Sequence, residues 1–425
     1  MTAAILFGCF LILLLLNIPV AICLGSAAVI AMLNEDLPLN IIAVNSQASV
    51  TKFVLLAIPF FIFGGNIMER SGISERLINL AQALVGHKRG GLAVVCVMVA
   101  CFFAAISGSG PATVAALGMI LIPAMVKSGY GEGFGAALTA TAGGIGLVIP
   151  PSISFVVISS ITGLSTGKLF LSGVVPGLVW GLSLVVASIF ILRSAKLELL
   201  PRATGAERLR AFKESVWGLL MPVIILGGIY GGIFTPTEAA AVSAFYGILV
   251  GFFIYRNLTF ADLFDVAVTS VVQTSVVMFI IMMASLFALV TTISGVGGAV
   301  SQVLMDFAGG NKILFLIVVN VIFLLAGCIM DGNSAYYIFL PIMMPVAVNL
   351  GIDPIHLCCI MVVNIAIGLV TPPVGANLYV ACSISGLSLK KLSWECLPFV
   401  IASIIALLFI TYIPPLVLYL PGLMR

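Results

Sequence analysis

The chain has 425 residues, of which 62% are hydrophobic and only 8% are charged, with a net charge of +3. Soluble globular domains carry roughly 25% charged residues, so this composition excludes a water-soluble protein and indicates one that crosses a membrane several times. Several uncharged runs are much longer than the roughly 20 residues that a helical span needs, so they must contain a crossing plus a turn, or a broken helix. The alternating segments of a membrane β-barrel do not occur, and we expect an all-α polytopic membrane protein.

Residues 1–89 contain the N-terminal spans. Residues 3–33 are apolar over too great a length for a signal peptide, and no charged segment precedes them. We expect them to form the first span, kinked near Asn17 and Pro19. Residues 71–89 are amphipathic, with apolar side chains at helical spacing: Ile73, Leu77, Leu80 and Leu84. This segment is either an interfacial helix on the membrane surface or an ordinary connector.

Two uncharged runs, residues 90–126 and 313–352, are interrupted near the middle by small and polar residues. The first interruption is the segment 107–113, Ser-Gly-Ser-Gly-Pro-Ala-Thr, and the second is 331–334, Asp-Gly-Asn-Ser. Helix propensity collapses at both. Each run forms either a re-entrant hairpin or two full spans. Prolines in the following arms shorten the regular helix and favour the hairpin: Pro123, Pro341 and Pro345.

A hexapeptide follows each interrupted run. Gly146–Pro151 reads Gly-Leu-Val-Ile-Pro-Pro, and Gly368–Pro373 in the second half of the chain reads Gly-Leu-Val-Thr-Pro-Pro. The chain is therefore two copies of one unit. Each double proline breaks a helix, because proline lacks an N–H and its ring clashes with the preceding turn. Paired breaks at corresponding positions of two halves point to a transporter binding site near the bilayer midplane.

The basic residues predict the orientation in the membrane. Six of the 18 Lys and Arg lie in the central segment 193–214, and cytoplasmic loops are enriched in these residues. With that loop in the cytoplasm, the two double-proline segments cross the membrane in opposite directions. The repeats are then inverted, with the N-terminus cytoplasmic and the C-terminus periplasmic.

The interruptions and breaks leave backbone carbonyls without donors at membrane depth, where they must be buried or line a polar cavity. Together with Ser, Thr and Asn oxygens they suit a small cation, whereas half-helix N-termini suit an anion. One interruption and one break make one pocket, so the two copies make two pockets with a substrate gap between them. Taken singly, Ser107, Ser109 and Thr371 are also compatible with small residues that let helices pack closely.

Asp331 is the only acid inside a long apolar run, which argues for a partner such as sodium or a helix N-terminus. The alternative is that Asp331 caps the second arm of its hairpin. Glu238 follows Thr235 closely, which is typical of a helix start and favours a structural cap. Asn364 and Asn377 flank the second break and are candidates for the same pocket.

The sequence does not contain the residues that other kinds of chemistry would need. His87 and His356 are the only histidines, and neither lies where it could serve as the base for Ser107 or Ser109 in an intramembrane protease. The nine cysteines have no CxxC spacing, and the chain has no phosphate-binding loop. We expect no enzyme activity, no organic cofactor and no nucleic-acid partner.

Three segments carry a resemblance to a known family. They are Phe103–Ala116, Gly232–Val242 and the two Gly-Leu-Val-x-Pro-Pro elements. Over nearly its whole length the chain resembles the large membrane subunit of tripartite ATP-independent periplasmic (TRAP) transporters, the DctM-like family. The resemblance implies an elevator-type fold of the ion-transporter superfamily, in which a transport domain with two hairpins slides through a scaffold.

The resemblance also implies a function and partners. The protein would import small organic anions with sodium through the bacterial inner membrane: C4-dicarboxylates, sialic acid or sugar acids. A periplasmic binding protein would deliver the substrate, and a small four-helix membrane subunit, expected as a separate chain, would brace the scaffold. The alternative is a self-sufficient proton- or sodium-coupled anion carrier of the same superfamily.

The implied domains follow the repeat. They are 1–89 (scaffold spans and amphipathic arm), 90–168 (first hairpin and broken helix), 169–311 (scaffold spans with the central loop 193–214), 312–389 (second hairpin and broken helix) and 390–425 (a C-terminal scaffold span).

The family's functional positions transfer to matching residues of this sequence, and at least two sodium ions and no other metal are expected. The first sodium site would comprise Ser107, Gly108, Ser109, Gly146, Ile149 and Pro151. The second would comprise Asp331, Gly332, Asn333, Gly368, Thr371 and Pro373. The substrate would contact Ser109, Thr113, Pro150, Asn333, Ser334, Pro372 and Asn377.

Overall fold

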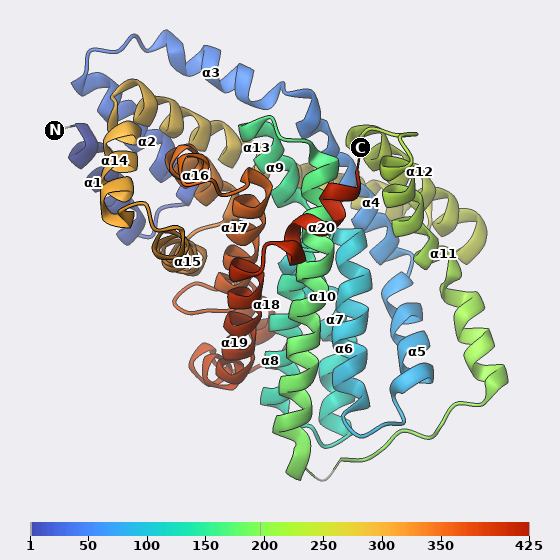
Figure 1. Ribbon diagram of the computed structural model, residues 1–425. Coiled ribbons are helices and arrows are strands. Elements are labelled where there is room, and N and C mark those ends of the chain that lie inside the picture. Colours follow the sequence, from blue (N-terminus) through green and yellow to red (C-terminus); the bar gives the residue numbers. More distant parts are fainter. Residues whose placement is uncertain (1, 196, 425) are drawn as a thin grey trace.

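The computed structural model describes residues 2–195 and 197–424, and over these ranges it is helical without any strand (Figure 1). Eight of its described helices are long and apolar enough to cross a membrane. The expected all-α polytopic architecture is confirmed.

The two N-terminal helices, α1 (Thr2–Leu15) and α2 (Val20–Asn34), lie side by side as an antiparallel pair. The hydroxyl of Thr2 bonds the carboxylate of Glu35, so the start of α1 lies beside the end of α2. Asn17 adopts a left-handed backbone (φ 61°) that closes α1, and Pro19 cannot continue the helix. The single kinked span predicted for residues 3–33 is therefore wrong, because the chain reverses direction there.

The amphipathic segment forms α5 (Ile73–Val85), which packs against α6 (Gly91–Ser107) and α11 (Gly205–Tyr230). Ile73, Leu77 and Leu80 are buried, and Leu84 is exposed. Ile73 sits against Gly218, where an added Cβ would lie 1.7 Å from the Ile73 Cδ1 atom. The segment is thus held by helix packing along its apolar face.

The internal repeat is confirmed by the helix boundaries. The first copy runs α6 (Gly91–Ser107), α7 (Gly110–Lys127), α8 (Glu132–Gly143), α9 (Ile153–Thr162) and α10 (Thr166–Ile191). The second runs α15 (Lys312–Ile329), α16 (Gly332–Asn349), α17 (Pro354–Gly368), α18 (Ala376–Ser385) and α19 (Leu389–Tyr412). Corresponding helices start at a nearly constant offset in the sequence, so the two copies match along their whole length.

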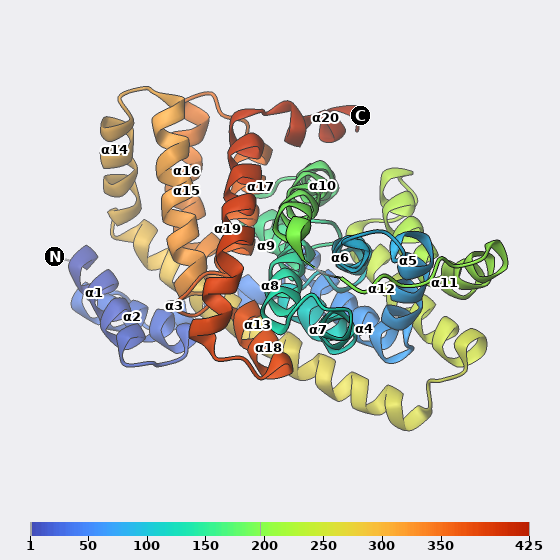
Figure 2. The ribbon, with the colours of Figure 1, turned by 90° about the horizontal axis from the view of Figure 1, so that it is seen from below.

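Each copy begins with a helical hairpin, α6–α7 or α15–α16. The base of the first hairpin lies beside the central loop, where Arg89 donates to the carbonyl of Arg193 (2.7 Å). The base of the second is closed by Lys312, whose Nζ donates to the carbonyl of Gly351 (3.2 Å). The hairpins point in different directions, since α15 and α16 stand upright in Figure 2 where α7 is seen end-on. Residues of both tips line the same cavity, so the tips lie near each other.

The remaining helices surround this pair of repeats. They are α3 (Asn40–Val50), α4 (Ala57–Arg70), α11 (Gly205–Tyr230), α12 (Pro236–Leu249), α13 (Phe260–Ile293), α14 (Val296–Ala308) and α20 (Pro415–Leu423). The long helix α13 packs against α2, α3 and α4 on one part of its length and against α16 on another.

The N-termini of α11 and α12 test the predicted bounds of the central loop and the predicted capping role of Glu238. The central loop was predicted over 193–214, but α11 already begins at Gly205, because Thr204 and Glu207 form a capping box there. Thr235 and Glu238 form a second box at the start of α12: the Thr235 N–H donates to Glu238 Oε2 (2.8 Å), and the Glu238 N–H donates to Thr235 Oγ1 (3.3 Å). The predicted structural role of Glu238 is confirmed.

The two copies are joined at α10 and α19. Trp180 of α10 is fully buried, and its Nε1 donates to the hydroxyl of Ser403 on α19 (2.7 Å). The sequence offset between these two residues is that of the repeat, so they occupy equivalent positions in the two copies. The contact therefore lies where the repeats face each other.

We expect Ser403→Ala to lower the thermal stability of the purified protein by about 1 kcal/mol, because the buried indole N–H loses its acceptor. Ser393→Ala is the matched control on the same helix, since its hydroxyl only donates to the carbonyl of Leu389. Equal melting temperatures for the two variants in detergent would refute this assignment.

Candidate functional site

The tips of both hairpins and the residues on either side of both helix breaks line one cavity of about 640 Å³, called the central cavity below. Its lining comes from four sources: residues 19–22 at the start of α2, 276–277 and 279–280 of α13, the tips 108–111 and 327 with 329–333, and residues 147, 153–154, 369 and 374–376 beside the breaks. Corresponding segments from the two halves of the sequence thus face one another across one space.

The tip of the first hairpin is a cluster of hydroxyl and carbonyl oxygens. The hydroxyls of Ser107 and Thr113 are 2.9 Å apart, and the Thr113 hydroxyl donates to the carbonyl of Ser109 (2.8 Å). Gly108 takes a left-handed backbone (φ 59°), and an added Cβ would lie 2.8 Å from the carbonyl oxygen of Pro151. Only glycine allows the tip to approach the first break this closely.

The first break also closes on this oxygen cluster. A Cβ at Gly146 would lie 2.7 Å from Thr113 Oγ1 and 2.9 Å from the carbonyl oxygen of Ser109. The structure therefore brings Ser107, Gly108, Ser109, Gly146 and Pro151 close together. The side chain of Ile149 points away from this cluster and packs against Gly177 of α10.

Asp331 begins α16 as its N-cap. Its Oδ1 accepts from the Ser334 hydroxyl (2.6 Å), and its Oδ2 accepts from the Ser334 N–H (3.1 Å). The capping role considered as an alternative is therefore present. Asp331 also lines the central cavity, together with Gly332 and Asn333, and it is the only acid among the lining residues of that cavity.

The second break contacts the second hairpin through backbone atoms. A Cβ at Gly368 would lie 2.5 Å from the Gly327 backbone, and the Val374 N–H donates to the carbonyl of Cys328 (3.0 Å). The Thr371 hydroxyl donates to the carbonyl of Ile367 (3.0 Å). Gly368, Thr371 and Pro373 are outside the set that lines the central cavity. The second break thus contacts the end of α15 through Gly368 and Val374.

The residues predicted to contact the substrate separate into two groups. Ser109 and Asn333 line the central cavity. The remaining five are not among its lining residues: Thr113, Pro150, Ser334, Pro372 and Asn377. Of these, Pro372 is exposed and the other four are buried.

The asparagines that flank the second break are both buried. Asn377 donates through Nδ2 to the carbonyl of Ala140 on α8 (3.0 Å), while its Oδ1 has no hydrogen-bond partner in the described residues and would lie 3.0 Å from a Cβ added at Gly110 of the first tip. Asn364 is fully buried and donates to Asn320 Oδ1 (2.8 Å). Neither lines the central cavity.

Sequence reasoning missed the scaffold wall that faces the tips. This wall comes from α2, α4 and α13, which the expected division assigns to the scaffold, and it is called the scaffold wall below. Its polar members Asn66, Glu69 and Gln273 line a second cavity of about 510 Å³, called the side cavity below. The side cavity shares Ser109 with the central cavity. The only available signal was the spacing of Asn66 and Glu69, one turn apart at the end of an apolar helix. Because Glu69 adjoins Arg70, it resembled an ordinary loop charge.

The oxygen atoms and helix N-termini around the central cavity suit a hard monovalent cation and an anion. Within residues 2–195 and 197–424, no group of three or more His, Cys, Asp and Glu side chains could hold a metal ion. The tips instead offer hydroxyl, carbonyl and single carboxylate oxygens, and the N-termini of α7 and α16 begin at the central cavity. Oxygen ligands suit alkali cations, and helix N-termini attract anions.

Residues 7–416 match the protein family described as the tripartite ATP-independent periplasmic transporter, DctM component. Over 94% of its length the chain is 44% identical to the C4-dicarboxylate TRAP transporter large permease protein DctM of Pseudomonas aeruginosa, covering 93% of that protein. It is 36% identical to the 2,3-diketo-L-gulonate TRAP transporter large permease protein YiaN of Escherichia coli, with 98% of both chains covered.

A third relative is longer than this chain. The isethionate TRAP transporter permease protein DctMQ of Oleidesulfovibrio alaskensis is 42% identical over 98% of the chain, which spans 66% of that relative. Among solved structures, the YdaH transporter of Alcanivorax borkumensis superposes with a TM-score of 0.63 over 88% of both chains, at 14% identity. That likeness concerns the fold alone.

Proposed function

The chain belongs to the DctM component family of tripartite ATP-independent periplasmic transporters, and from this premise we propose that it imports small organic anions across the bacterial inner membrane with sodium. The observation that carries the proposal is that two oxygen-rich hairpin tips and the residues flanking two helix breaks line one central cavity. The substrate class is taken from the names of relatives that carry C4-dicarboxylates, 2,3-diketo-L-gulonate or isethionate.

Two cation sites fit the residues present. The first would use the Ser107 hydroxyl and Ser109 carbonyl with the backbone near Gly146. The second would use the Asp331 carboxylate with backbone oxygens near Gly368. The substrate would lie between them, with its carboxylates toward the N-termini of α7 and α16, since the positive ends of helix dipoles favour anions. The chain would thus bind the anion without an arginine.

We propose that the moving part of this carrier is larger than the sequence analysis assumed. The expected division places α10 and α19 in the scaffold. In the structure α10 packs against α6, α17 and α19, and α19 packs against α8 and α17. Because Trp180 and Ser403 tie these two helices together in the interior, α10 and α19 would travel with the hairpins. The helices α2, α4 and α13 would form the fixed wall.

The revised N-terminal fold also changes the proposed orientation. The start of α1 lies beside Glu35, at the end of α2, so in this proposal the N-terminal pair would enter and leave the membrane on the same side. With the central loop in the cytoplasm, Thr2 would then lie on the periplasmic side. The predicted cytoplasmic N-terminus depended on the single span and loses its support.

The partners are part of the same proposal. A periplasmic binding protein would deliver the anion, and a small membrane subunit would pair with the scaffold. The length of the DctMQ relative, of which this chain spans 66%, supports a permease with an additional part.

The test is uptake of labelled C4-dicarboxylates and sugar acids into proteoliposomes that contain the chain with its small subunit. We expect uptake only with an inward sodium gradient and with the cognate binding protein outside. Uptake that is equally fast in choline would refute sodium coupling. Uptake that needs no binding protein would favour the self-sufficient carrier considered from the sequence.

A further inference from the structure

The side cavity lies between the scaffold and the tip of the first hairpin. It is lined by α4 and α13 on one side, with the polar residues Asn66, Glu69 and Gln273, and by α6 and α7 on the other, with Ser107, Ser109 and Ala112. The approach is close, because a Cβ at Gly65 would lie 3.3 Å from the carbonyl oxygen of Ile106.

The polar groups of the scaffold wall are held in place by one another. Asn66 on α4 donates to the Ser270 hydroxyl (2.9 Å) and to Gln273 Oε1 (2.9 Å), both on α13. Both amide hydrogens of Asn66 are therefore used within the scaffold. This leaves its Oδ1 and the carboxylate of Glu69, one turn further along α4, as acceptors on the wall.

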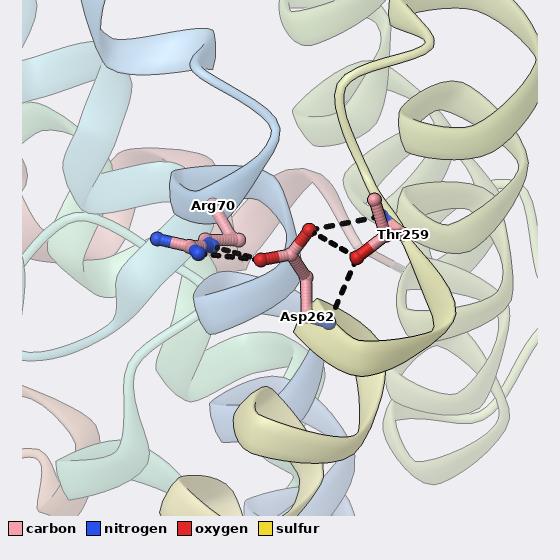
Figure 3. A network of polar contacts seen from close by, with 3 residues as sticks. All are labelled: Arg70, Thr259 and Asp262. Atoms are coloured by element: carbon pink, nitrogen blue, oxygen red, sulfur yellow. Dashed lines mark hydrogen bonds and ion pairs between the residues drawn. The ribbon is translucent and has the colours of Figure 1, made fainter.

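Glu69 is the charged group of the side cavity. It is half-buried, and no ion pair or hydrogen bond joins its carboxylate to any residue in the described ranges. The neighbouring Arg70 does not neutralise it, because Arg70 Nε donates to Asp262 Oδ1 (2.9 Å) and Asp262 also accepts from Thr259 (Figure 3). A partly desolvated carboxylate without a partner raises the local affinity for a cation.

The position of Glu69 carries a charge in only one of the two copies of the repeat. At the sequence offset that relates the two copies, the position of Glu69 corresponds to Thr291 or Thr292 near the end of α13. Both are uncharged, and their hydroxyls donate to backbone carbonyls of the same helix. The charge of Glu69 therefore has no counterpart at the corresponding positions of the second copy.

We propose that the side cavity is a cation vestibule, in which Glu69, with Asn66 Oδ1, attracts monovalent cations to the oxygens of Ser107 and Ser109. The cavity reaches those oxygens directly, because both serines are among its lining residues. A fixed negative charge in a low-dielectric cleft concentrates cations and disfavours anions. The sodium role of this vestibule rests on the proposed function, whereas its negative potential does not.

The potential is measured first, by a readout that is independent of transport. In an Ala112→Cys protein, the rates of modification by a cationic and an anionic methanethiosulfonate reagent are compared, with the protein lacking this cysteine as the background for the nine native ones. We expect the cationic reagent to be favoured, and Glu69→Gln to lower the ratio of the two rates about tenfold. The effect should shrink as salt shortens the Debye length.

Glu75→Gln is the matched control, because Glu75 lies exposed on α5 and is not among the lining residues of the side cavity. It should leave the ratio of rates unchanged. Equal ratios for Glu69→Gln and Glu75→Gln would overturn the vestibule.

Sodium dependence is measured second, in the uptake assay. Glu69→Gln should raise the sodium concentration for half-maximal uptake about three- to tenfold, with an unchanged KM for the anion at saturating sodium. A changed KM with unchanged sodium dependence would overturn the vestibule and assign Glu69 to the substrate path. A wild-type protein without sodium dependence would refute the proposed function instead, while the modification ratio would still decide the potential of the side cavity.

Discussion

Replacing Gly368 by alanine is expected to reduce uptake per reconstituted protein by more than about tenfold and to lower its melting temperature. The added Cβ would lie 2.5 Å from the Cα and carbonyl carbon of Gly327, a backbone contact that no side-chain rotation relieves. Overpacking of a close contact costs typically about 1–3 kcal/mol, and here the helix arm itself must move. That movement separates the second break from the second hairpin. Uptake and thermal unfolding of the same preparation measure both effects.

The loss of uptake should be larger where the added Cβ lies closer to the opposing backbone. Gly327→Ala places its Cβ 3.0 Å from Gly368 Cα, so we expect a smaller loss than for Gly368→Ala. Gly227→Ala on α11 is the control, because no atom outside its own helix lies within 4 Å of an added Cβ there. Alanine is the better helix former, so this control should keep its stability. Wild-type uptake by Gly368→Ala would show that the close approach is dispensable.

Replacing Asp331 by alanine is expected to raise the sodium concentration for half-maximal uptake about tenfold or more. The change removes the only carboxylate that lines the central cavity, and contacts to charged groups are worth about 1.5–3 kcal/mol each. The same change removes the N-cap of α16, which alone costs about 1 kcal/mol of stability. Sodium titration of uptake, normalised to the amount of folded protein, separates the two contributions.

Asp353→Ala provides the matched control for the loss of a cap. Asp353 caps α17 in the same manner, since its Oδ1 accepts from the N–H groups of Ile355 (2.8 Å) and His356. It is not among the lining residues of the central cavity. We expect a similar loss of stability with an unchanged sodium requirement. If both variants titrate with sodium like the wild type, Asp331 acts as a cap alone.

The repeat, the hairpin tips and the breaks could be predicted because their signals are local. Proline removes a donor and glycine allows left-handed backbone wherever they occur, so the interruptions at Gly108 and Asp331 and both double prolines end helices in the structure as expected. The constant offset between the two copies likewise appears in the helix starts. The roles of these residues in binding sodium and the substrate stay predictions.

The scaffold wall could not be predicted in the same way. Glu69 and Gln273 lie far apart in the sequence and carry no shared motif, and they face the first hairpin only because α4 and α13 pack together. Asn377 is fully buried, with its Nδ2 bonded to the carbonyl of Ala140 and its Oδ1 beside Gly110 of the first tip, and the sequence did not indicate either neighbour. Polarity near a break does not indicate which face of the helix the side chain takes.

The N-terminal error has a similar cause. Asn17 and Pro19 interrupt the helix whether the chain bends or turns back, and only the packing of α2 against α1 and α13 decides between the two. The sequence by itself determined the membrane class, the two copies and the positions of the broken helices, because composition and backbone stereochemistry act residue by residue. The tertiary structure alone decided which faces meet, where the scaffold charge lies and which polar residues reach the cavities, because these depend on contacts between distant segments.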